Sequence, residues 1–128
     1  MKKNIIATNK APEAIGPYSQ GISYGELVFT SGQLPMDPVT AVFPDGGIKE
    51  QTRQSLLNVQ AVLEQSGSSL KSVIKTTCFL ADMADFAEFN AVYSEFFGTE
   101  GAPARSCVQA AKLPKNALVE VEAIAHKL

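Results

Sequence analysis

Two hydrophobic periodicities alternate along this chain, and their order constrains the fold more than any other feature. Residues 48–66 carry a stripe that recurs every three or four positions, which predicts a helix with one buried face, and Gly67 lies where that helix should end. Residues 73–80 are rich in β-branched side chains and predict a strand. Residues 85–97 again show helical spacing, now of aromatic residues, between a potential cap at Asp82 and a terminating glycine. The residues of the two stripes are Ile48, Thr52, Leu56, Val59 and Leu63 in the first, and Phe86, Phe89, Tyr93, Phe96 and Phe97 in the second.

Strand patterns flank these helices on both sides. Residues 18–31 predict a β-hairpin, in which Gly25 can take the positive φ of a tight turn. Two further strands are predicted near 104–110 and 117–126, with Pro114, Lys115 and Asn116 turning between them. The order of elements predicts an α+β fold: one sheet with two helices packed on one face, in a single domain over residues 1–128.

A sheet covered by helices on one side leaves its second face for water or for another subunit. The strand over 119–125 is apolar on one face, while Glu120 and Glu122 line the other. We expect an uncovered apolar strand face, and this predicts an oligomer.

Composition excludes several classes of protein. The net charge of −2 weighs against a role that depends on a basic, nucleic-acid-binding surface. No apolar stretch has the length of an export signal or of a membrane span, so no membrane role is expected. Two separated cysteines and one histidine, His126, make neither a disulfide scaffold nor a zinc site. We therefore expect a cytoplasmic protein with reduced thiols and no bound metal.

Arg105 is the strongest candidate for binding chemistry. Because alternate residues of a strand share a face, Arg105, Cys107 and Gln109 should point one way, and small neighbours leave room beside the arginine. A guanidinium grips a carboxylate with two parallel hydrogen bonds. The alternative is a structural ion pair with a nearby glutamate. Cys107 could act as a nucleophile or simply line a cavity, but no histidine base is evident.

Glu120 is the second candidate. Within a strongly β-type sequence its carboxylate could lie in a pocket and activate a water, be solvated, or pair with Lys75 or Arg105. Tyr18 could either pack or offer its phenol to a ligand. Asn90, beside Phe89 in the second predicted helix, could be a surface residue or an amide that reaches a neighbour. Ser31-Gly32 ends a strand, where the missing Cβ of the glycine could let a ligand approach its backbone N–H, or where the pair could simply form a strand-ending turn.

Four segments together resemble the successive signatures of the Rid (YjgF-like) family, and they span nearly the whole chain. They are Gly16-Pro17-Tyr18-Ser19-Gln20, Phe29-Thr30-Ser31-Gly32-Gln33-Leu34-Pro35, Pro103-Ala104-Arg105-Ser106-Cys107-Val108 and Leu118-Val119-Glu120-Val121-Glu122-Ala123. One departure is conservative: Val121 stands where isoleucine or methionine is commoner.

The resemblance implies a chorismate-mutase-like fold, a homotrimer and active sites in clefts between subunits. It further implies hydrolysis of 2-imino acids and their enamine tautomers, such as 2-iminobutanoate and 2-iminopropanoate, which leak from pyridoxal-phosphate enzymes. The products are 2-keto acids and ammonia, and no cofactor takes part. Carried over by position, Arg105 binds the substrate carboxylate and Glu120 positions or activates the water. The pocket is lined by Tyr18, Ser31, Gly32, Asn90 and Cys107.

Two other functions stay open at this point. Some relatives carry the label of endoribonuclease or translation inhibitor, which would require a basic groove or aromatic stacking platforms. The same cleft could also serve a non-catalytic protein that binds small carboxylates.

Overall fold

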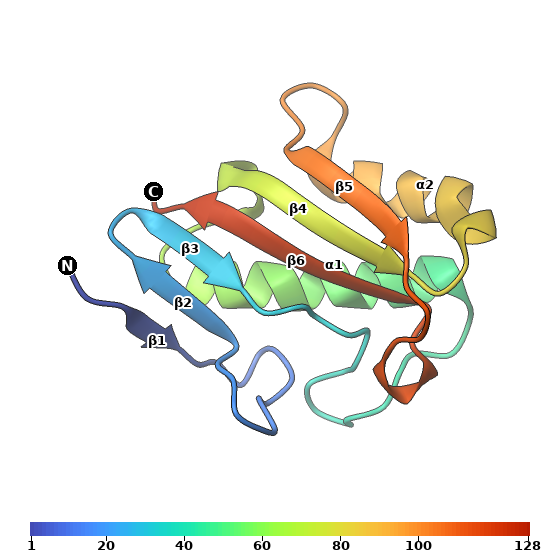
Figure 1. Cartoon of the computed structure of the whole chain (residues 1–128), viewed down its shortest axis with the longest axis horizontal. Helices are drawn as coiled ribbons and strands as arrows, with labels where there is room; N and C mark the ends of the chain where they lie inside the picture. The colour runs from blue at the N-terminus through green and yellow to red at the C-terminus, as the bar shows by residue number, and fades with distance from the viewer.

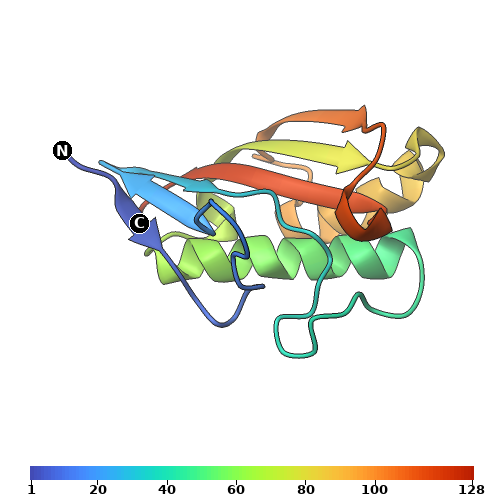
Figure 2. The same cartoon turned by 60° about the horizontal axis from the view of Figure 1, so that its bottom comes forward.

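Six strands form one mixed sheet, and both α-helices pack on the same face of it (Figures 1 and 2). The computed structural model describes all 128 residues. The elements are β1 (Asn4–Ile6), β2 (Gly21–Tyr24), β3 (Leu27–Thr30), α1 (Ile48–Gln65), β4 (Val73–Leu80), α2 (Phe86–Phe97), β5 (Ala104–Gln109) and β6 (Val119–His126), with short 3-10 turns at Leu70–Ser72, Met83–Asp85 and Pro114–Asn116. The predicted α+β class is confirmed.

The strand order is β1-β2-β3-β6-β4-β5. Only β4 and β5 are parallel, and α2 connects them; the other neighbours are antiparallel. The C-terminal strand therefore lies in the middle of the sheet, between β3 and β4, while β5 forms one edge (Figure 1).

The core lies between the sheet and the helices. Strand β6 contributes its alternate residues Val119, Val121, Ala123 and Ala125, which are all buried. They meet the apolar stripe of α1, whose largest members are fully buried. Apolar residues recur at every second position in β6 and at every third or fourth position in α1, so each element has one apolar face, and these two faces pack together.

Local signals in the sequence explain the element ends. Gly25 turns the β2–β3 hairpin at φ 58°, and Gly67 follows the end of α1 at φ 81°, a conformation that favours glycine. Asp82 caps the 3-10 turn before α2 rather than α2 itself, since its carboxylate accepts a bond from the Ala84 N–H at 2.9 Å.

The expectation of an uncovered apolar strand face requires a correction. The apolar face of β6 is the one that the helices cover, and the bare face carries Glu120 and Glu122. That bare face nevertheless includes partly exposed apolar side chains on the neighbouring strands, namely Tyr24, Leu27, Phe29 and Val108. The bare face is therefore mixed in character rather than apolar.

Candidate functional site

Arg105 projects from the edge strand β5 toward α2. Its Cα partner on β4 is Thr76, which is fully buried on the helix-covered face, so Arg105 points to that face as its alternation with Ala104 and Ser106 predicts. One guanidinium nitrogen, Nη1, donates to Oδ1 of Asn90 at 2.7 Å. Asn90 lies on α2, so the helix that connects β4 to β5 also supplies the arginine's polar partner.

Three aromatic rings of α2 surround the same guanidinium. Its central carbon lies 4.7 Å from the centroid of Tyr93, 5.5 Å from that of Phe86 and 5.9 Å from that of Phe89. Each distance lies within the range of a cation–π interaction. These rings stabilise a positive charge without supplying a counter-ion.

No carboxylate pairs with Arg105. The one ion pair of the chain joins Arg53 to Glu95 at 2.8 Å, on the exposed surface. The structural ion pair considered for Arg105 is therefore absent from the monomer. A guanidinium offers five N–H donors, and Asn90 engages one of its nitrogens, which leaves donors for an external carboxylate.

Glu120 lies on the other face of the sheet. Its Cα partner on β4 is Phe79, and the neighbouring residue of β4, Cys78, is buried toward the helices. Because neighbouring residues of a strand point to opposite faces, Phe79 and Glu120 point away from the helices. Glu120 is half-buried against Gly32, where any Cβ would collide with the carboxylate. Burial, and secondarily the charge of Glu122, raises the pKa of Glu120 above its usual value.

A cavity of about 510 Å³ opens beside this carboxylate. Its lining combines Glu120, Gly32 and Tyr18 with apolar groups and with Lys115 from the turn before β6. Lys115 and Asn116 both adopt positive φ, at 57° and 58°, so this turn is held in a conformation that non-glycine residues rarely take. The cavity lining thus combines the residues Glu120, Tyr18 and Lys115 with apolar groups.

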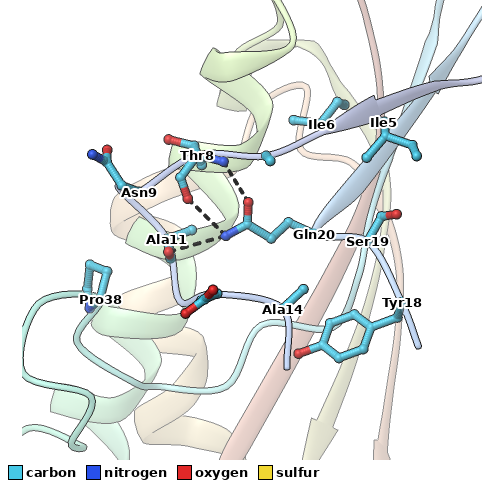
Figure 3. A pocket seen from close by; sticks show the side chains of 12 residues that line it. Ile5, Ile6, Thr8, Asn9, Ala11, Ala14, Tyr18, Ser19, Gln20 and Pro38 are labelled. Atoms are coloured by element: carbon cyan, nitrogen blue, oxygen red, sulfur yellow. Dashed lines mark hydrogen bonds between the residues drawn. The ribbon is translucent and has the colours of Figure 1, made fainter. Parts of the chain in front are cut away.

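A second cavity, of about 660 Å³, shares Tyr18 and Gln20 with the first (Figure 3). Figure 3 shows the Gln20 amide in the middle of its lining, bonded to the backbone of Thr8 and Ala11. A third acceptor, the Pro12 carbonyl, lies 2.7 Å from the same nitrogen. Gln20 therefore fixes the β1–β2 connection, which carries Tyr18, and its own polar atoms are all engaged.

The sequence-predicted residues fall into two groups. Arg105, Asn90 and Cys107 lie on the helix-covered face at the β5 edge, whereas Tyr18, Gly32 and Glu120 line the cavity of the bare face. Ser31 belongs with the second group through its neighbour Gly32, and its hydroxyl donates to the Ser19 carbonyl. Within one chain the two groups do not meet.

Cys107 is half-buried beside Cys78, its Cα partner on β4. Burial raises the pKa of the Cys107 thiol, and the nearby Arg105 charge only partly opposes this. A raised pKa keeps the sulfur protonated near neutrality, which favours a lining role over a nucleophilic one.

Sequence reasoning did not assign a site role to the rings of Phe86, Phe89 and Tyr93, or to Lys115. The helical spacing of the three aromatic residues predicts only the buried face of a helix. The available signal was topological: a helix that connects two adjacent parallel strands must cover them, and therefore covers Arg105. Nothing in the local sequence distinguished Lys115.

No cluster of three or more histidine, cysteine, aspartate or glutamate side chains is placed to hold a metal ion. Neither α-helix combines the length and the apolar character that crossing a bilayer requires.

Many known proteins are similar to this chain in sequence and in structure. Residues 8–127 match the model of the family described as Endoribonuclease L-PSP. A RutC family protein of Pyrococcus abyssi is 51% identical over 127 residues, covering 99% of both chains. The 2-iminobutanoate/2-iminopropanoate deaminase of Salmonella typhimurium is 50% identical over 122 residues, covering 94% of both.

Solved structures agree with the sequence comparison. The crystal structure of Escherichia coli TdcF with bound serine superposes with a TM-score of 0.91 at 48% identity. The match covers 98% of this chain and 99% of that one. The likeness therefore extends over nearly the whole fold.

Proposed function

The chain belongs to the Endoribonuclease L-PSP (YjgF-like, or Rid) family, and from this premise we propose that it is a hydrolytic deaminase of reactive 2-imino acids. Its substrates are 2-iminobutanoate, 2-iminopropanoate and their enamine tautomers, released in the cytoplasm by pyridoxal-phosphate enzymes. The products are the 2-keto acids and ammonia. Support comes from relatives about half identical in sequence, one of them named for this activity.

The unpaired guanidinium of Arg105 is the observation that carries the proposal. A positive charge held by aromatic rings and one amide, with no carboxylate from its own chain, fits a group that binds an anionic ligand. A planar carboxylate can take two of the free N–H donors at once. The substrate's carboxylate thereby fixes the position of the adjacent imine carbon.

Glu120 activates the water molecule that attacks the imine. Its ionised carboxylate accepts a proton from a water molecule as the water oxygen attacks C2 of the iminium, and the C=N double bond becomes a C–N single bond. The protonated Glu120 then returns its proton to the carbinolamine nitrogen. The C–N bond breaks as the carbonyl forms, ammonia leaves, and it takes up the hydroxyl proton as ammonium, so that Glu120 is again ionised. Because an iminium carbon is already electrophilic, holding carboxylate and water in place supplies most of the rate.

Arg105 and Glu120 can serve one substrate only if two subunits contribute. They point to opposite faces of the sheet within a chain, so Arg105 of one subunit must approach Glu120 of a neighbour. We propose a homotrimer with three such sites. The partly exposed apolar side chains on the bare face are suited to subunit contact.

The remaining residues shape the pocket. Asn90 orients Arg105, Gly32 lets the Glu120 carboxylate lie against the backbone, and Tyr18 closes the cavity wall. Ser31 holds the strand end through its bond to Ser19, and Cys107 lines the arginine side as a protonated thiol.

The direct test is the release of ammonia and keto acid from imines made in situ by an amino-acid oxidase. Purified protein should accelerate release from the imines of alanine and 2-aminobutanoate, and Arg105→Ala should not. Absence of acceleration would contradict the proposal. Binding of 2-oxobutanoate without any turnover would instead indicate a carboxylate-binding protein, and RNA cleavage lost in Arg105→Ala would indicate the ribonuclease alternative.

A further inference from the structure

Three residues lie together where β5, β4 and α2 meet, namely Arg105, Thr76 and Tyr93. Thr76 and Arg105 are direct Cα partners on adjacent strands. The Tyr93 hydroxyl lies 2.7 Å from the Thr76 hydroxyl, while the Tyr93 ring lies under the Arg105 guanidinium, 4.7 Å from it. One side chain of α2 therefore contacts both strands.

The hydroxyl contact is buried, which makes it costly to break. Thr76 is fully buried and Tyr93 is 6% exposed. A buried phenol needs a hydrogen-bond partner, and Thr76 is the one it has. This bond fixes how far the ring can move along the strands, and hence where the ring face lies.

Tyr93 is also the closest of the three rings to the guanidinium, and it is itself braced. Phe89 lies 5.5 Å and Phe97 4.6 Å from it, centroid to centroid. Phe97 contacts Tyr93 but is not among the rings over Arg105. The guanidinium thus rests on a ring that is fixed by a buried bond and by aromatic packing on both sides.

We infer that Tyr93, held by Thr76, is a positioning residue for Arg105 and sets the affinity of the site for the substrate's carboxylate. The inference rests on the proposed role of Arg105. An arginine side chain has several rotatable bonds, and Asn90 alone anchors only one nitrogen. The ring beneath the guanidinium keeps its plane oriented, so that two N–H donors face the ligand together.

Three variants separate this role from simple packing. Tyr93→Leu removes the ring beneath Arg105. Phe96→Leu is the matched control, because Phe96 is a partly buried ring of the same helix that is neither among the rings over Arg105 nor paired with Tyr93. Tyr93→Phe keeps the ring and loses only the bond to Thr76.

The measurements are the Kd for 2-oxobutanoate by calorimetry, kcat and KM on an imine made in situ, and Tm. We expect Tyr93→Leu to weaken 2-oxobutanoate binding by about threefold to thirtyfold and to raise KM correspondingly, the range of a cation–π contact. Phe96→Leu should lower Tm while leaving Kd and KM within about twofold. Tyr93→Phe should recover most of the affinity that Tyr93→Leu loses.

Two results would overturn the inference. The first is wild-type Kd and KM in Tyr93→Leu. The second is an equal loss of affinity in Phe96→Leu, which would show that general packing is responsible. Failure of the proposed function appears differently: the wild-type protein would release no ammonia from any imine, whereas the Kd comparison among the variants could still be made.

Discussion

Arg105 and Glu120 project from opposite faces of one sheet, two strands apart. Arg105 is in register with Thr76 and Glu120 with Phe79 on the strand β4 that separates them. Because neighbouring residues of β4 alternate in direction, the two side chains cannot converge on one small substrate inside a single chain.

Arg105→Lys should lower kcat/KM by about tenfold to a thousandfold, because lysine keeps the charge but loses the planar fork that fixes the carboxylate. Arg105→Ala should be worse, since the counter-charge is also lost. Tm should change little in either variant, as no ion pair within the chain is broken. A nearly silent Arg105→Lys together with a destabilised Arg105→Ala would mean that the arginine is structural.

Gly32→Ala should lower kcat/KM by roughly tenfold or more, because the new Cβ collides with the Glu120 carboxylate and must displace it. Gly47→Ala is the control, since a Cβ there meets no atom and the backbone lies at negative φ. Equal activities in the two variants would contradict the placement of Glu120 at the reaction centre.

Cys107→Ala should keep a substantial fraction of activity. The raised pKa of this thiol leaves it protonated near neutral pH, where a thiol is a poor nucleophile. Alkylation of Cys107 by iodoacetamide should accordingly become fast only above the ordinary thiol pKa of 9.0. Loss of several orders of magnitude in kcat/KM, with Tm intact, would show that the sulfur attacks.

The pH profile should respond to Glu122, which does not line the Glu120 cavity. Since only ionised Glu120 can accept a proton from water, kcat/KM should fall as pH drops through its pKa, which lies above the ordinary 4.5. Glu122→Gln removes one cause of that raised pKa and should move the acid limb to lower pH.

A thermodynamic measurement checks the same pKa independently. A carboxyl whose folded pKa is raised contributes full stability below the unfolded pKa and loses it as pH rises through the folded value. Glu120→Gln should therefore gain Tm relative to wild type as pH increases from below 4.5 toward neutrality. An acid limb unmoved in Glu122→Gln, or a Tm difference independent of pH, would contradict the assignment.

Local sequence predicted the face to which a strand residue points better than it predicted which strands pair with one another. The grouping of Arg105 with Cys107 followed from period two alone, and the order of elements predicted both helices and the sheet. Whether Glu120 could approach Arg105 stayed open, because this depends on β6 inserting beside β4, a pairing of residues far apart in the chain.

Two other features lacked a local signal for physical reasons. Strand β1 has only three residues and is held by one neighbour at the sheet edge, so its sequence shows no alternation to detect. The aromatic residues near Arg105 obey helical periodicity, as core residues do. Only the packing of α2 over β4 and β5 turns part of that stripe toward the arginine.

The most direct test of a site shared between subunits is complementation between two inactive variants. Arg105→Ala and Glu120→Ala are unfolded together in equal amounts, refolded, and assayed on an imine beside each variant treated alone. If each site takes Arg105 from one subunit and Glu120 from the next, mixed trimers regain one intact site each, and random assembly restores about one quarter of wild-type activity. If both residues act within one subunit, every site stays defective and the mixture remains as inactive as its parents.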